Sequence, residues 1–208
     1  MEVIDGKKSN IVLTITTLFL AFLIISASFL KVATIRYAYS PMVLSETKEV
    51  EELKPIEYYL AYQGKINPDS LLWYGKALRD KVWYLVTFDS LKKAELNLLF
   101  SDKRLNSSIE LFKNNKPDLG LSTLTKAEKY LLKASDIKHD DNEFLKKLAT
   151  ATLKHIEVIN TEILPNCPED LKPQVTLTLN TTYMVFESVR NEMLSKGLVA
   201  PNNPYEKR

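Results

Sequence analysis

A run of twenty residues without a charged side chain, from Ile11 to Leu30, constrains this chain more than any other feature. Lys8 precedes the run and Lys31 follows it. An α-helix rises about 1.5 Å per residue, so a run of this length crosses the roughly 30 Å hydrocarbon core of a bilayer once. The sequence therefore predicts a single transmembrane helix at residues 11–38, after a short cytoplasmic tail at residues 1–10.

The sequence is compatible with either a cleaved signal peptide or an uncleaved signal anchor in this segment. Ser26, Ala27 and Ser28 are small residues of the kind that signal peptidase reads, so the segment could be removed by cleavage. The run is longer than the usual cleavable core of about 7–15 apolar residues, which favours an uncleaved signal anchor. Basic residues are equally frequent near its two ends, and the positive-inside rule gives little direction. We expect an extracytoplasmic C-terminal domain at the cell membrane, because a short basic N-terminus commonly precedes a translocated domain.

The rest of the chain has the composition of a helical domain with balanced charge. The sequence holds only 5 glycines and its charged fraction is 26%, whereas strands joined by tight turns use more glycine. Lys and Arg number 28 against 26 Asp and Glu. That balance does not indicate nucleic-acid binding, which depends on clustered basic residues. The single cysteine, Cys167, excludes an internal disulfide.

Apolar residues recur at helical spacing in five segments between residues 68 and 197. The first helix is predicted to begin after a cap at Asp69 or Ser70. Its apolar side is expected to face the core, and consists of Leu71, Tyr74, Leu78, Val82 and Leu85.

Polar caps mark the starts of the following helices. We expect the second helix after Asp89, the third after Asp118 and the fourth after Asp140. Thr125 and Glu128 offer a second, later capping box for the third helix. The fifth helix covers residues 175–193, although residues 175–182 alternate as a strand would.

Short loops between amphipathic helices favour an antiparallel bundle, because each helix must bury its apolar side against a neighbour. The predicted fold class is therefore all-α, with the transmembrane helix followed by an antiparallel bundle of about five helices. We predict a stalk at residues 39–67, the bundle at residues 68–197 and a disordered tail at residues 198–208.

Residues 64–105 carry a recurring pattern. It consists of Gly64, Ile66, Pro68-Asp69-Ser70, Leu72, Tyr74 and Lys76, then Asp89, Lys93-Ala94-Glu95-Leu96 and Arg104-Leu105. The pattern resembles the domain of unknown function 5667 family, whose members tend to follow a single membrane helix, and the likeness extends over about residues 64–134. The chain departs from it at Leu71, where the family often has proline, and at Gly75, where a larger residue is usual. The resemblance implies an extracytoplasmic helical domain and no established reaction.

The sequence contains none of the common catalytic motifs, such as a Gly-rich phosphate loop, His-Glu-x-x-His or Gly-x-Ser-x-Gly. His139 and the acidic residues after it are interpreted as a polar turn with a helix cap, since they lack the spacing of a calcium loop. We expect His155 at the boundary of the core. No basic cluster lies near Cys167 in the sequence to stabilise a thiolate. These patterns predict no enzyme activity, no metal and no cofactor.

Aromatic residues gather in the part of the domain that follows the membrane segment. Exposed aromatics often mark binding surfaces, so these side chains are candidates for contact with lipid or a partner. By helical angle Trp73 lies opposite Tyr74 and Val82, and we expect it to be partly exposed. The candidate partner-binding residues are Trp73, Trp83, Tyr58, Tyr59 and Tyr62. Within the membrane helix, small residues on one side allow another helix to approach closely, and these are Thr14, Thr17, Ala21 and Ser28.

The sequence is typical of a non-enzymatic, single-pass binding or scaffold protein of the bacterial envelope. Its expected partners are the lipid bilayer and another envelope or membrane protein. One alternative is a regulatory subunit that relays a signal through its membrane helix, although about ten residues before that helix are too few to fold around a cytosolic factor. A metal-dependent enzyme is the least favoured alternative. Nothing in the sequence indicates the oligomeric state.

Overall fold

A computed structural model of the chain describes residues 55–138 and 140–205. These residues form five α-helices and no strand, which confirms the all-α fold class for this part of the chain. None of their helices is long and apolar enough to cross a membrane. The predicted transmembrane helix at residues 11–38, with Thr14, Thr17, Ala21 and Ser28, lies outside the described residues.

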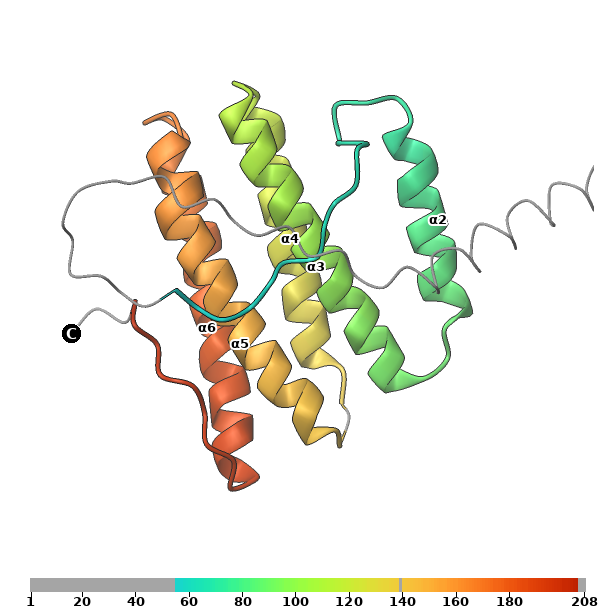
Figure 1. The fold of residues 1–208 in the computed structure, drawn as a ribbon, viewed down its shortest axis with the longest axis vertical. Coiled ribbons are helices and arrows are strands. Elements are labelled where there is room, and N and C mark those ends of the chain that lie inside the picture. The colour runs from blue at the N-terminus through green and yellow to red at the C-terminus, as the bar shows by residue number, and fades with distance from the viewer. Residues whose placement is uncertain (1–54, 139, 206–208) are drawn as a thin grey trace, which may run out of the picture. The chain divides into compact units, whose positions relative to one another are not determined.

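Four of the helices form a bundle, and a fifth lies at its edge. The bundle consists of α3 (Ser90–Lys113), α4 (Pro117–Asp136), α5 (Asn142–Val158) and α6 (Lys172–Ser195). The loops from α3 to α4 and from α4 to α5 are short, so these neighbours run antiparallel (Figure 1). Helix α5 continues through a π-helical turn at Ile159–Ile163 and a 3₁₀ turn at Leu164–Asn166 before α6.

Helix starts follow the predicted caps only in part. The Asp89 carboxylate accepts the Lys92 N–H at 2.8 Å, which confirms the predicted cap of α3. Asp141, one residue later than expected, caps α5 by accepting the Phe144 N–H at 2.7 Å. Residues 175–182 lie within α6, so the helical interpretation of that stretch is correct.

The predicted starts of the first and third helices are wrong. Helix α2 (Trp73–Val86) begins after Leu72 without a side-chain cap, and Asp69 instead forms an ion pair with Lys116. Helix α4 begins at Pro117, which is favourable at a first helical position because its missing N–H would have no partner there. The proposed capping box at Thr125 and Glu128 lies inside α4, and Thr125 donates to the carbonyl of Leu121 within the helix.

Helices α3 and α4 approach each other closely at Gly120. The Ser108 hydroxyl of α3 donates to the Gly120 carbonyl at 2.9 Å. A Cβ atom at residue 120 would lie 2.9 Å from the ring of Phe112, which is buried. The glycine therefore permits the contact between these two helices.

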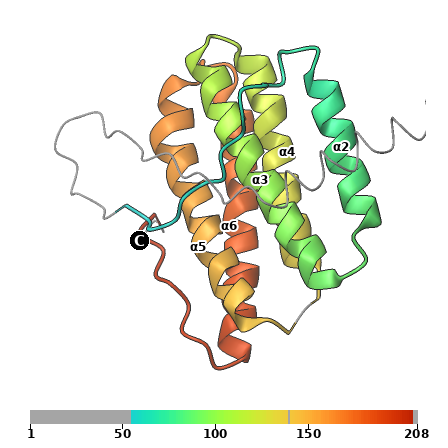
Figure 2. The same ribbon diagram turned by 45° about the vertical axis from the view of Figure 1, so that its right-hand side comes forward.

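Residues 55–72, which we call the strap, cross the outside of the bundle from α5 toward α2 (Figures 1 and 2). The Ile56 N–H donates to Glu157 of α5 at 2.9 Å. Farther along, the Asn106 side chain of α3 donates to the Ala61 carbonyl at 2.9 Å. The predicted stalk is thus part of the folded domain from residue 55 onward.

The C-terminal residues 198–205 also pack against the bundle, where a disordered tail was expected. Asn203 is buried, and Tyr205 is partly buried against one of the core clusters. The Tyr183 hydroxyl of α6 donates to the Tyr205 carbonyl at 3.2 Å. Burial raises the pKa of Tyr205 to about 12, and Glu157 and Tyr183 add to the shift. Apolar contacts with α6 order a segment that has little helical pattern of its own.

Helix α2 lies beside α3 at the edge of the bundle (Figure 2). Trp83 of α2 meets the ring of Phe100 of α3 edge to face, with centroids 6.3 Å apart. Among the residues of α2 only Asp80 is buried. The predicted orientation of this helix is therefore reversed: the side with Tyr74, Leu78 and Val82 faces outward, because α3 accommodates the Trp83 side instead.

Candidate binding surface

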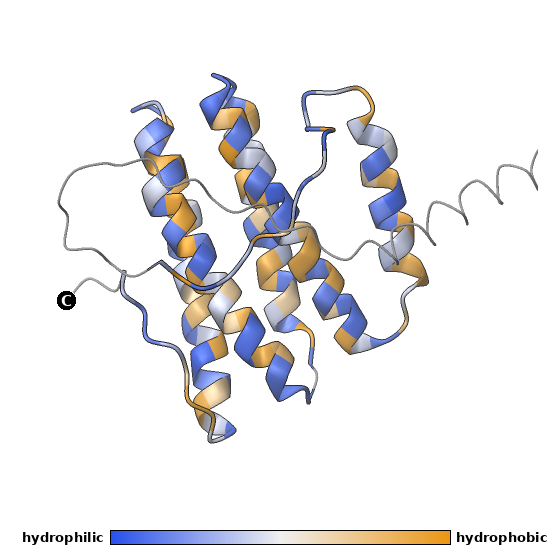
Figure 3. Ribbon diagram, viewed as in Figure 1, coloured by the Kyte–Doolittle hydropathy of each residue, from blue (hydrophilic) through white to orange (hydrophobic). Residues whose placement is uncertain are grey.

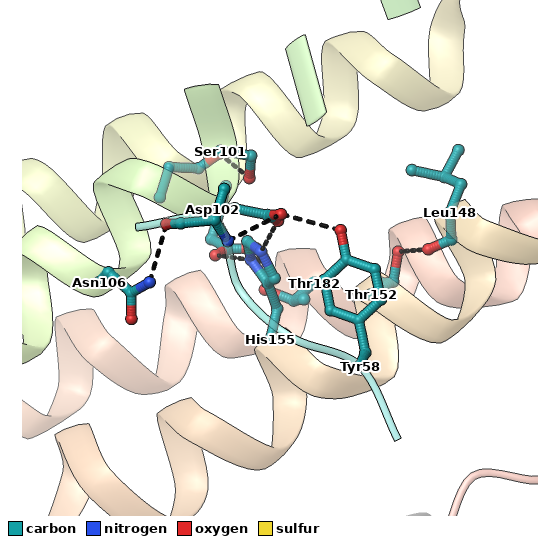
Figure 4. Close-up of polar contacts among 11 residues, drawn as sticks. Tyr58, Ser101, Asp102, Asn106, Leu148, Thr152, His155 and Thr182 are labelled. Carbon is teal, nitrogen blue, oxygen red and sulfur yellow. Dashed lines mark hydrogen bonds and ion pairs between the residues drawn. The ribbon is translucent and has the colours of Figure 1, made fainter. Parts of the chain in front are cut away.

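A buried polar network joins all four helices of the bundle (Figure 4). Asp102 comes from α3, Glu128 from α4, His155 from α5 and Thr182 from α6, and each side chain is buried. The two ring nitrogens of His155 contact different helices. Nδ1 lies 2.8 Å from Glu128 Oε1, and Nε2 lies 3.2 Å from Asp102 Oδ1.

The remaining carboxylate oxygens of the network have partners too. Thr182 Oγ1 donates to Glu128 Oε2 at 2.8 Å. The Tyr58 hydroxyl of the strap donates to Asp102 Oδ2 at 2.8 Å, and the Ala61 N–H reaches the same oxygen at 3.5 Å. Buried charges are tolerated when each is paired and hydrogen-bonded in this way. The network therefore holds the strap to the bundle as well as the helices to one another.

His155 is completely buried, which corrects its expected place at the boundary of the core. Burial alone would lower its pKa, but the carboxylates of Glu128 and Asp102 outweigh that effect and raise the pKa to about 9. The imidazole is thus protonated at neutral pH. A protonated ring with both nitrogens donating to enclosed carboxylates is suited to cross-linking helices rather than to accepting a proton from a substrate.

The outward side of α2 carries a row of exposed apolar residues. Leu78 is 63% exposed, and the residues one or two turns away on the same side are also exposed. We call this set the α2 stripe, and it consists of Leu71, Tyr74, Leu78, Val82 and Leu85. Further exposed apolar residues lie at the two ends of the helix, namely Leu72, Val86 and Phe88. Figure 3 shows that α2, at the edge of the bundle, carries hydrophobic segments between hydrophilic ones.

Cations and aromatic rings hold the opposite side of α2 to the domain. Lys76 Nζ lies 4.8 Å from the ring centroid of Trp73, and the Arg104 guanidinium lies 5.7 Å from the same centroid. Arg104 also lies 4.5 Å from the ring centroid of Tyr130 in α4. Such cation–π contacts strengthen when they are shielded from water, as Arg104 is. They orient α2 so that the stripe faces away from the bundle.

Lys76 ties α2 to the strap as well. Its ammonium donates to the carbonyls of Gln63 and Ile66. Burial lowers the pKa of Lys76 to about 8. The carboxylate of Asp80 opposes this shift, whereas nearby cations, among which Lys103 has the largest effect, add to it. The position of the stripe thus depends on the strap, and through Tyr58 on the buried network.

The five aromatic residues predicted to bind a partner differ in their exposure and contacts. Tyr59 and Tyr62 are exposed, at 63% and 47%. Trp73 is partly exposed, as expected, and lies against Lys76 and Arg104. Trp83 packs on Phe100, and Tyr58 points inward to Asp102.

Sequence reasoning missed the α2 stripe because this helix has two apolar sides. One contains Leu78 and Leu85, and the other contains Trp73 and Trp83. Helical periodicity identifies both sides but not which of them packs inward. Charge does not distinguish the two sides either, because the side that packs inward carries Lys76 and the buried Asp80.

Other candidate reactive groups lie away from this surface. Cys167 is a buried free thiol near the end of α5, and burial raises its pKa. Within residues 55–138 and 140–205, no group of three or more His, Cys, Asp or Glu side chains is arranged to hold a metal ion. His139 lies outside the described residues.

Comparison with protein families identifies a match. The profile of the domain of unknown function DUF5667 matches residues 65–168. The chain belongs to the DUF5667 family. The matched region runs from the strap through α2, α3, α4 and α5, and includes the whole α2 stripe. Asp102, Glu128 and His155 lie within it, whereas Tyr58 and Thr182 lie outside.

No curated protein and no solved structure matches the chain. The family assignment therefore confirms the resemblance seen in residues 64–134 and supplies no reaction, ligand or partner.

Proposed function

We propose that this member of the DUF5667 family is a non-enzymatic binding or scaffold protein, anchored in the cell membrane by residues 11–38 and carrying its helical domain on the extracytoplasmic side. The observation that supports a binding role most directly is the outward-facing α2 stripe. A domain that forms a closed core from four helices gains nothing from leaving five large apolar residues in water. Exposed apolar surface of this kind marks contact with a protein or a membrane.

The buried network supports a structural rather than catalytic use of its titratable groups. His155 is enclosed by helices, and both of its nitrogens are engaged by carboxylates. A general base must reach its substrate, so a shielded and protonated imidazole does not fit that role.

Membrane fractionation of the full chain in a bacterial host tests the anchor. The protein should remain with the membranes after carbonate extraction, and external protease should digest residues 40–208 in spheroplasts. A soluble form that begins at Phe29 would show a cleaved signal peptide and would contradict the proposal.

Removal of residues 1–38 distinguishes the scaffold from the alternative, a regulatory subunit that relays a signal through its membrane helix. A scaffold without this segment should still bind its partner. A relay should lose its effect on the partner even where binding persists, because the membrane helix itself would carry the signal.

A further inference from the structure

We propose that the α2 stripe lies on the surface of an anionic lipid bilayer, so that α2 acts as an interfacial helix which holds the domain against the membrane. This inference rests on the proposed membrane location of the chain and names the partner of its exposed surface. The first argument is the shape of the surface. Tyr74, Leu78 and Leu85 lie along one side of a helix whose other side is attached to the bundle, so a flat apolar medium can reach them together.

The second argument is charge. Residues 71–93 carry five basic side chains against two acidic ones, while the whole chain is nearly balanced, at 28 basic and 26 acidic residues. One of the two acids, Asp80, is buried and pairs with Arg79 at 2.6 Å. Exposed Lys81 borders the stripe, and exposed Lys92 follows at the start of α3. Basic residues beside an apolar helix side are typical of helices that bind anionic lipid. Lys76 donates to the strap on the opposite side of α2, and Arg79 pairs with Asp80. The free positive charge near the stripe therefore comes from Lys81 and Lys92, and exposed Asp89 offsets part of it.

The same charges disfavour a second copy of the chain as the occupant. Two stripes packed against each other would bring Lys81 of one copy near Lys81 of the other. Asp80 cannot relieve the repulsion, because it is already engaged and buried. Like charges at the borders of paired helices oppose their association.

The two ends of the described residues lie away from the stripe. The strap leaves the described fold at Ile56, where its N–H is bound by Glu157 of α5. The C-terminal segment packs on α6 through Tyr205. Helices α5 and α2 lie at opposite edges of the domain (Figures 1 and 2), so neither end of the described chain starts beside the stripe.

The geometry is compatible with an anchor that begins upstream. Between Ala38, where the predicted membrane helix ends, and Pro55 the chain has enough residues to extend up to about 60 Å, at about 3.3–3.6 Å per residue. That length is sufficient for α2 to reach the bilayer surface, where an interfacial helix inserts its apolar side by about 5–10 Å.

The test places an environment-sensitive fluorophore on the stripe of the full chain. Cys167 is first replaced (Cys167→Ser), and a single cysteine is then introduced by Leu78→Cys. Leu177→Cys serves as the matched control, because Leu177 is an exposed leucine of α6 with a similar exposed fraction, 68%. Each labelled chain is reconstituted into vesicles of phosphatidylcholine alone or of an equimolar mixture with phosphatidylglycerol. Lipids with a bromine near the headgroup end of the acyl chain act as the quencher.

We expect several-fold stronger quenching at residue 78 than at residue 177 in the anionic vesicles. Lys81→Glu combined with Lys92→Glu should weaken the quenching there and have little effect in phosphatidylcholine alone. Equal quenching at the two positions would overturn the proposal. So would a disulfide that links two copies of the unlabelled Leu78→Cys variant under mild oxidation, since a second copy would then occupy the stripe.

Failure of the proposed function gives a different result. If the chain is not anchored, neither labelled variant will float with the vesicles after carbonate treatment. An anchored chain that floats but shows no preferential quenching at residue 78 would leave the anchor intact and remove only the role of α2 at the lipid surface. Protection of the residue 78 label by an added envelope protein, without lipid quenching, would likewise assign the stripe to a protein partner and contradict the inference.

Discussion

Nδ1 of His155 lies 2.8 Å from Oε1 of Glu128, across the interface between α5 and α4, and both side chains are buried. Asp102 of α3 engages the other ring nitrogen at 3.2 Å. A single protonated imidazole therefore bridges three helices. Stability should depend on that proton.

We predict that His155 makes the domain less stable as pH rises from neutrality. Above about pH 8 the lowered pKa of Lys76 opposes this loss, so the difference from His155→Gln isolates the histidine contribution. The folded-state pKa of His155, about 9, lies above the ordinary value of 6.5. The stabilisation is therefore complete below pH 6.5 and is lost as the pH rises through the folded pKa, with a total of a few kcal/mol. Urea unfolding between pH 6 and pH 10 measures this loss. In His155→Gln this loss should be absent, and an unchanged slope would assign the pH dependence to other groups.

Removal of single hydrogen bonds from the network should have unequal costs. Thr182→Val leaves Glu128 Oε2 without the donor that reaches it at 2.8 Å, so we expect a loss of about 1–3 kcal/mol in unfolding free energy. Tyr58→Phe should cost about 1 kcal/mol, because the Ala61 N–H still faces the same oxygen of Asp102. Tyr58→Phe should also increase hydrogen exchange in residues 55–62, which Thr182→Val should not. The reverse pattern of exchange would contradict the role of Tyr58 in holding the strap.

The two helical glycines should respond to alanine with opposite signs. Gly75→Ala in α2 adds a methyl group into open space and should stabilise the domain by about 0.5–1 kcal/mol through helix propensity. Gly120→Ala in α4 places a Cβ atom 2.9 Å from the buried Phe112 ring, and should cost about 1–3 kcal/mol despite the same gain in propensity. Thermal melting of both variants beside the parent decides the matter. A higher melting temperature for Gly120→Ala would show that the contact between α3 and α4 can adjust to the added methyl group at little cost in stability.

Asn97 of α3 offers a stabilising substitution. It is buried, and neither polar atom of its amide has a hydrogen-bond partner among the described residues. Asn97→Leu removes these unsatisfied groups at similar volume, and we expect a gain of about 1–2 kcal/mol in chemical unfolding. Asn106→Leu is the matched control, because Asn106 donates to the Ala61 carbonyl, and that variant should lose stability. Destabilisation by Asn97→Leu would indicate that the amide has a role in the fold that its contacts do not reveal.

A fragment that starts near Val50 should be soluble and predominantly helical by circular dichroism, and it should unfold cooperatively. The described residues have their own core, built from residues of α3, α4, α5 and α6. A chelator should leave the melting temperature unchanged, because no structural metal is assigned to this domain. A shift in the melting temperature on chelation would contradict that assignment.

The sequence by itself determined the helical class, the approximate course of the helices and the family. These follow from local properties: apolar spacing, the cap at Asp89 and a pattern of residues within 64–105. Neighbouring residues set such properties through backbone geometry, so they can be read along the chain without knowledge of distant contacts.

Only the tertiary structure decided which side of α2 faces outward and why His155 is buried. Both depend on residues far apart in the sequence. The Trp83 side of α2 packs inward because Phe100 and Arg104 of α3 provide a place for it. His155 is tolerated in the core because Asp102 and Glu128, which come 53 and 27 residues before it, converge on its ring. Periodicity shows that a side chain can be buried, but the long-range partners that stabilise it there are set by how the helices pack.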